Sequence, residues 1–203
     1  MNRKILIILS ILGATSSQAK PDFKGDFKGD FKGDFQGVFA GLVGGLEITH
    51  LSVNNQLFER RQLSVGPALG AGLTFSDYYL GLEGSCVQNS VLLVKPNQKL
   101  SKKSTYHGMI RFGKVIHDNF LPFVGLGTGL MRYKYQGPAH NTSLRLNTTD
   151  ANLGVDAFVT PYFLIRSSLR YTVATSFHKG DPTLSTGKKP RIFSLEVGAF
   201  YKF

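Results

Sequence analysis

Seven charged residues stand out because each interrupts an otherwise apolar, alternating stretch of the sequence. Each occupies the polar phase of its stretch, opposite to the leucines, valines and phenylalanines. If the stretches are β-strands, side chains of one phase share one face, where opposite charges from different strands can pair. We expect a network of ion pairs on that face, formed by Glu47, Glu83, Arg111, Asp156, Arg166, Arg170 and Glu196.

A His-x-Ser pair offers a second kind of chemistry. His50 and Ser52 are two residues apart, which puts both side chains on one face of a strand. A nucleophilic serine needs a base within hydrogen-bond reach and usually an acid that orients the base, a role for which Glu47 or Glu59 is available. The simpler interpretation is a histidine and a serine at the end of a strand, so we predict no catalytic residues.

The histidines are too scattered to form a metal site from sequence spacing. None of them has a partner at the spacing typical of metal ligands, so we predict no metal and no cofactor. The five histidines are His50, His107, His117, His140 and His178.

The elements that must position these residues are strands. Apolar residues alternate with small or polar ones through most of the chain after Gly37, most clearly from Gln62 to Ser76. We expect eight strands, at residues 37–52, 62–76, 78–88, 105–116, 120–135, 150–160, 163–175 and 191–203.

The linkers between the expected strands alternate in length. Tight linkers around Asp77, at 117–119 and at 161–162 alternate with long ones, and tight turns join antiparallel neighbours. Alternating short and long connections are typical of outer-membrane barrels. The pattern predicts an all-β fold, an eight-stranded antiparallel up-and-down transmembrane β-barrel. The long linkers are 53–61, 89–104, 136–149 and 176–190.

The phase of the strand expected at 120–135 is ambiguous. Placing Arg132 and Lys134 inside the barrel also places Val124 and Leu126 inside. The register of this strand stays open at the level of sequence, and a β-bulge is one solution.

The amino-terminal part divides into two short segments before the barrel. Residues 1–19 have two basic residues, an apolar run and an Ala19 ending, as expected for a secretory signal cleaved before Lys20. The following unit Asp22-Phe23-Lys24-Gly25 is repeated three more times, with Gln36 replacing lysine in the last copy. We expect residues 20–34 to be a flexible periplasmic arm and residues 35–203 to be the barrel.

The last strand alternates aromatic and apolar residues up to the final residue of the sequence. Such a strand resembles the recognition signal that the outer-membrane assembly machinery reads. The residues predicted to carry this signal are Phe203, Tyr201, Ala199 and Val197.

Several short motifs resemble the outer-membrane protein A-like eight-stranded barrels and their small surface-antigen relatives. Gly37–Gly41 is similar to the first strand of that family, Phe120–Gly127 to a Pro-aromatic-Val-Gly strand opening, and Gly154–Pro161 with Leu169–Tyr171 to the penultimate hairpin. The resemblance covers residues 35–203. It implies a protein of the bacterial outer membrane of a Gram-negative organism.

The formal net charge of +11 can then be explained without binding to nucleic acid. Much of the basic excess falls in or beside the expected outer loops, where lipopolysaccharide presents phosphate groups. We therefore expect lipopolysaccharide as a partner and no nucleic acid. The candidate contacts are Arg60, Arg61, Lys102, Lys103, Lys188 and Lys189.

The sequence as a whole favours a non-catalytic envelope or surface protein that interacts through its outer loops with a host or surface ligand. Because an eight-stranded barrel is only wide enough for side chains to fill it, the charged network is expected to be a structural plug. Three alternatives stay open: a lipid A-modifying enzyme, a narrow gated ion pore along the buried charges, and a soluble lipocalin-like binder.

Overall fold

The computed structural model describes residues 34–53, 56–95, 98–136, 141–177 and 190–203. The predicted signal segment and nearly all of the predicted arm lie outside these residues. Within the described part of the chain, no helix is long and apolar enough to cross a membrane.

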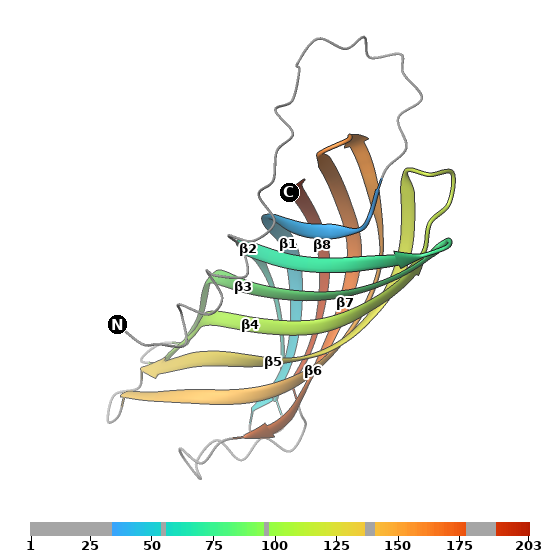
Figure 1. Ribbon diagram of the computed structural model, residues 1–203. Helices are drawn as coiled ribbons and strands as arrows, with labels where there is room; N and C mark the ends of the chain where they lie inside the picture. Colours follow the sequence, from blue (N-terminus) through green and yellow to red (C-terminus); the bar gives the residue numbers. More distant parts are fainter. Residues whose placement is uncertain (1–33, 54–55, 96–97, 137–140, 178–189) are drawn as a thin grey trace, which may run out of the picture.

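The chain forms eight antiparallel strands that hydrogen-bond in chain order and close into a barrel (Figure 1). Closure comes from β1, which pairs with β2 on one side and with β8 on the other. The predicted fold class is thereby confirmed. The strands are β1 (Gly37–Val53), β2 (Gln56–Phe75), β3 (Tyr78–Lys95), β4 (Gln98–Lys114), β5 (Phe120–Gln136), β6 (Asn141–Thr160), β7 (Phe163–Phe177) and β8 (Arg191–Lys202).

The three tight connections lie where the sequence predicted them. Ser76, His117 and Asp118 adopt positive φ angles of 57°, 50° and 58° in the first two turns, and residues 161–162 form the third turn. We call this end of the barrel, which also carries Asp34 and Phe203, the turn end. The opposite end, where the odd strands lead into the even ones, is the loop end.

The prediction of long linkers at 53–61, 89–104 and 136–149 is wrong. Most of these residues extend β2, β3, β4 and β6 toward the loop end. The sequence does not alternate clearly between apolar and polar residues in these segments, although their backbones continue to pair with neighbouring strands. Of the fourth expected linker, 176–190, residues 178–189 lie outside the described residues.

The outer wall is an apolar band bounded by aromatic side chains at each end. At the turn end the ring pairs Tyr78–Phe112 and Tyr162–Tyr201 stack with centroids 6.0 and 6.2 Å apart. Near the loop end Tyr106 and Phe193 are exposed. Aromatic girdles around an apolar band are the signature of a barrel in a bilayer. Exposed residues of the band include Leu46, Leu63, Val65, Leu69, Leu80, Leu82, Ile110, Val124, Leu126, Leu153, Leu169, Leu195 and Val197.

The interior is filled by side chains. One apolar cluster lies near the turn end, a second one on β5 to β8 lies near the loop end, and polar and charged groups lie between and beside them. The turn-end cluster includes Phe35, Phe39, Tyr79, Leu121, Phe158, Leu164 and Phe200. The loop-end cluster consists of Met131, Tyr133, Leu146, Ala174 and Ile192.

The register of β5 is continuous against β6, with no bulge between them. Val124 and Leu126 face outward, with 52% and 70% of their surface exposed, while Leu121 and Phe123 are buried inside. Arg132 therefore also faces outward. The irregularity lies in the neighbouring strand, where β4 shifts register between Lys102 and Ser104.

Candidate functional site: the charged interior and the basic rim

Two arginines and two carboxylates form a closed, electrically neutral cluster above the turn-end apolar layer. Arg111 Nη2 lies 2.6 Å from Asp156 Oδ2, and Arg111 Nη1 lies 3.3 Å from Glu83 Oε2. Arg166 Nε lies 2.7 Å from Asp156 Oδ1, and its Nη1 bonds the same Glu83 oxygen. All four side chains are buried. The cluster ties β3, β4, β6 and β7 together across the interior.

Aromatic rings complete the surroundings of the two guanidinium groups. Arg111 Cζ lies 3.7 Å from the ring centroid of Phe123, and Arg166 Cζ lies 4.3 Å from that of Phe200. Such contacts stabilise a desolvated guanidinium, which is planar and stacks on aromatic rings, more than they would stabilise a lysine ammonium. Gly125, the register partner of Arg111 on β5, leaves room for the long side chain.

Two further ion pairs occupy the layer nearer the loop end. Lys102 Nζ lies 2.7 Å from Glu47 Oε2, and Gln62 donates a second hydrogen bond to the same oxygen. Arg170 Nη2 lies 3.0 Å from Glu196 Oε2. All seven residues of the predicted network therefore lie inside the barrel. Each is at most 7% exposed, and each is paired.

Lys102 was predicted to contact lipopolysaccharide, and this prediction is wrong. Its side chain is buried in the ion pair with Glu47, whereas its neighbour Lys103 is exposed. Because of the register shift between Lys102 and Ser104, Lys102 and Thr105 are both buried although they are three residues apart. The sequence predicts a loop at 89–104, and a loop has no inner or outer face.

Sequence reasoning missed a group centred on Asp150. His107 Nδ1 lies 2.9 Å from Asp150 Oδ2, and Thr172 Oγ1 donates a hydrogen bond of 2.6 Å to Asp150 Oδ1. His107 shares its phase with Arg111, and Asp150 shares its phase with Asp156. From this shared phase, the sequence could have predicted that His107 and Asp150 also face the interior.

The charged layer is nearly neutral as a whole. The inward carboxylates are Glu47, Glu83, Asp150, Asp156 and Glu196, and the inward cations are Lys102, Arg111, Arg166 and Arg170, with His107 beside Asp150. Each carboxylate has a basic partner within 3.3 Å. The turn-end apolar cluster separates these groups from the turn-end mouth, and the Lys102–Glu47 pair lies beside the loop-end cluster, because Lys102 is the register partner of Tyr133. This arrangement suits a plug, because removing any single partner would leave a buried charge uncompensated.

The catalytic alternative loses one of its proposed acids. Glu47 points inward, whereas His50 lies on the outward phase of β1, so Glu47 does not orient His50. Glu59 is the register partner of His50, but its side chain and that of Ser52 are outside the description. Among the described residues, no group of three or more His, Cys, Asp or Glu side chains is arranged to hold a metal ion.

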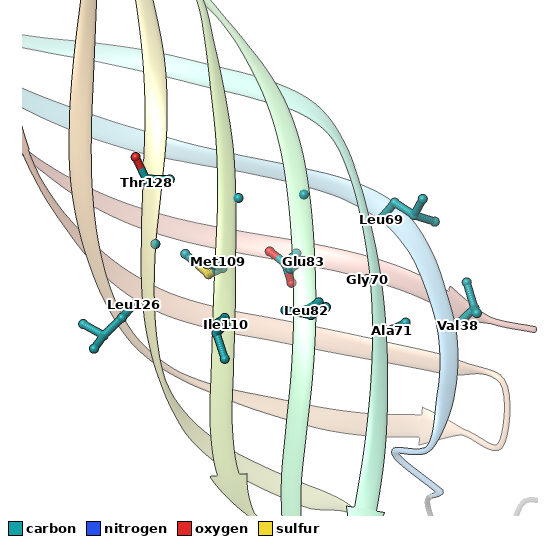
Figure 2. A pocket seen from close by; sticks show the side chains of 13 residues that line it. Val38, Leu69, Gly70, Ala71, Leu82, Glu83, Met109, Ile110, Leu126 and Thr128 are labelled. Carbon is teal, nitrogen blue, oxygen red and sulfur yellow. The ribbon is translucent and has the colours of Figure 1, made fainter. Parts of the chain in front are cut away.

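A groove of about 630 Å³ lies in the barrel wall across β2 to β5 (Figure 2). It is lined by the outward-facing register partners Gly84 and Gly108. Leu82, Ile110 and Leu126 also line it. A Cβ added to Gly108 would meet no atom within 4 Å. The groove belongs to the apolar outer wall and suits contact with acyl chains of the bilayer.

The loop-end rim carries exposed cations on several neighbouring strands. Arg132 of β5 and Arg145 of β6 are direct register partners, and both are exposed. Lys103 of β4 is exposed beside them, and Arg132 Cζ lies 5.4 Å from the ring of Tyr106. We call Lys103, Arg132 and Arg145 the rim patch. Arg61 is exposed on β2, while the side chain of Arg60 and all of Lys188 and Lys189 lie outside the description.

Exposed charge is distributed unequally between the two ends. Among residues with described side chains, the exposed carboxylates are Asp34, Asp77 and Asp118, all at the turn end. Among the residues with described side chains, no exposed carboxylate lies near the rim patch. The two ends of the barrel therefore differ in electrostatic character as well as in their connections.

The predicted assembly residues all lie on the outer face of β8. Phe203, Tyr201 and Val197 are 67%, 46% and 57% exposed, and Ala199 is exposed on the same face. The Phe203 ring meets that of Tyr201 edge to face at 5.2 Å, and the Phe203 amide donates to the Val38 carbonyl oxygen at 3.0 Å. The end of β8 is thus joined to the start of β1.

Solved structures share this architecture. Neisserial surface protein A matches with a TM-score of 0.58 and 16% identity, over 83% of this chain and 98% of that chain. Ail, the attachment invasion locus protein of Yersinia pestis, matches with a TM-score of 0.53 and 12% identity, over 83% of this chain and 100% of that chain.

The fold is that of the eight-stranded outer-membrane β-barrels. At these identities the likeness concerns the fold alone. No family model matches the chain, and no curated protein sequence matches it significantly.

Proposed function

We propose that the protein is a non-catalytic surface barrel of the bacterial outer membrane, oriented with its loop end outward and its arm in the periplasm. The observation that carries the proposal is the closed, filled barrel with an apolar outer wall and exposed cations at the loop end. Because side chains fill the interior of the barrel, other molecules can bind only to its outer surface. The rim and the connections beyond it are then the parts that meet other molecules.

The rim patch is the proposed contact with lipopolysaccharide. Like charges directly opposite each other on neighbouring strands destabilise a sheet, so Arg132 beside Arg145 favours an anion between them. The patch lies next to Tyr106, an aromatic residue of the loop-end girdle, which is the level of lipid headgroups. Phosphate groups at this level would accept charge-assisted hydrogen bonds from the arginines.

Binding of a further anionic ligand through the loop end is part of the same proposal. Ail has been crystallised with the heparin analogue sucrose octasulfate, a polyanion held by a protein of the same fold. The exposed basic residues of this chain would suit a ligand of that class.

The test compares stability in two lipid environments. Replacing Lys103, Arg132 and Arg145 with glutamine should remove the stabilisation that lipopolysaccharide gives over a neutral, phosphate-free detergent. At about 1 kcal/mol for each cation near a charged surface, the loss should reach about 3 kcal/mol. The matched control is Lys114→Gln, because Lys114 also lies over an outward aromatic ring, Tyr78, but at the turn end. Equal losses in the two variants, or none in either, would contradict the proposal.

A further inference from the structure

The last copy of the four-residue repeat docks into the turn-end mouth of the barrel. The Phe35 side chain is only 2% exposed. Its ring centroid lies 4.8 Å from that of Phe158 and 6.5 Å from that of Tyr79. Phe35 thus belongs to the apolar layer that closes this end of the barrel, although it precedes β1 in the chain.

The other positions of the copy also have distinct roles. The Asp34 carboxylate accepts a hydrogen bond from Lys202 Nζ of β8 and another, of 2.9 Å, from the Gln36 amide. Partial burial raises the pKa of Asp34, but these hydrogen bonds outweigh it and the pKa is lowered overall. Gly37 has a φ of +122°, a backbone conformation that residues other than glycine rarely adopt. Gln36 is exposed.

The preceding copies keep every residue that docks and change only the exposed one. Residues 22–25, 26–29 and 30–33 each read Asp-Phe-Lys-Gly, and the docked copy reads Asp-Phe-Gln-Gly. The carboxylate, the aromatic ring and the glycine therefore recur at the same spacing. The lysine of the other copies corresponds to Gln36, whose side chain points to solvent.

We infer that the turn-end mouth is a binding site for an Asp-Phe-x-Gly peptide unit, and that every copy of the repeat is an equivalent ligand for it. The site takes the aromatic ring between Phe158 and Tyr79 and the carboxylate at Lys202. Whichever copy directly precedes Val38 occupies the site. The number of copies can then change by whole units while the barrel stays closed.

Deletion of residues 34–37 tests this inference, because it places Asp30-Phe31-Lys32-Gly33 directly before Val38. The unfolding midpoint of the full chain in urea and detergent should equal that of the wild type. Phe35→Ala should instead raise the unfolding equilibrium constant by roughly 100-fold or more, as expected when a buried phenylalanine is removed. Adding Phe31→Ala to the deletion should reproduce the loss.

Two further variants keep the test decisive. Deletion of 26–29 shortens the repeat equally without touching the docked copy and should behave as the wild type. If Phe35→Ala fails to assemble, Phe35→Leu replaces it, with a smaller loss expected. The inference is overturned if deletion of 34–37 destabilises the barrel as much as the Phe35 substitution, or if neither Phe35 substitution has any effect.

Discussion

The paired charges inside the barrel depend on one another, and this dependence can be measured at single residues. Arg166→Met would leave Glu83 and Asp156 with Arg111 as their shared cation, so one buried negative charge would be uncompensated. Breaking a buried pair in this way costs about 3 to 5 kcal/mol. Replacing Asp156 and Arg166 together, by leucine and methionine, should cost less, because Arg111 and Glu83 remain as a neutral pair. Urea unfolding in detergent micelles gives the stability of Arg166→Met, of Asp156→Leu and of the double variant. A double variant that loses as much stability as the two single variants together would show that the four charges are not coupled.

Lys102 and Lys103 provide a matched pair of adjacent residues with different roles. Lys102→Met should destabilise the barrel by a few kcal/mol, because Glu47 would lose its buried cation. Lys103→Met should leave stability in detergent unchanged within about 0.5 kcal/mol, since its side chain is exposed. The reverse order of the two unfolding midpoints would show that the assignment of the two lysines to the inside and the outside is wrong.

The residues of the interior were partly predictable from the sequence. Glu47, Arg111 and Arg170 lie within strongly alternating stretches, where the phase of the apolar residues fixes the face of the charged ones. Lys102 lies beside a register shift and beyond the apolar band, so no neighbouring pattern fixes its face. His107 and Asp150 had the right phase, but their pairing is a contact between β4 and β6, which are not adjacent strands, and depends on the diameter of the closed barrel.

The strands were predicted well where they cross the apolar band and poorly beyond it. Both ends of β7 agree with expectation to within two residues, whereas β2 and β6 begin six and nine residues earlier than expected. The sequence signal is the alternation imposed by burial of one face, and the added residues are held by backbone pairing instead. The alternation of apolar and polar residues therefore does not predict where the strands end at the loop end.

The end of β8 is the element whose role in assembly can be tested directly. Phe203→Ala should lower the amount of folded protein in the membrane fraction, because it removes the last aromatic side chain of the outward row on β8. The control is Phe75→Ala, which removes another exposed aromatic residue near the turn end. Folded protein is measured as the heat-modifiable band on a gel. Equal amounts for Phe203→Ala and the wild type would refute the assembly role.

Among the described residues, an apolar band faces outward, and the charged side chains lie inside the barrel or at its two ends. A soluble lipocalin-like binder would need the opposite arrangement, with apolar side chains around an internal cavity. Here the interior holds paired charges beside two apolar clusters, and the groove in the wall faces outward. We therefore propose that the outer surface binds other molecules and that the interior stabilises the barrel.

Single-channel recording in planar bilayers tests this central claim most directly. The wild-type protein and Arg111→Ala should both show conductance indistinguishable from the protein-free bilayer, because paired side chains fill the charged region and the turn-end apolar cluster closes one end of it. Steady conductance of the wild type, with an ion selectivity that changes in Arg111→Ala, would show instead that the buried charges line an ion path.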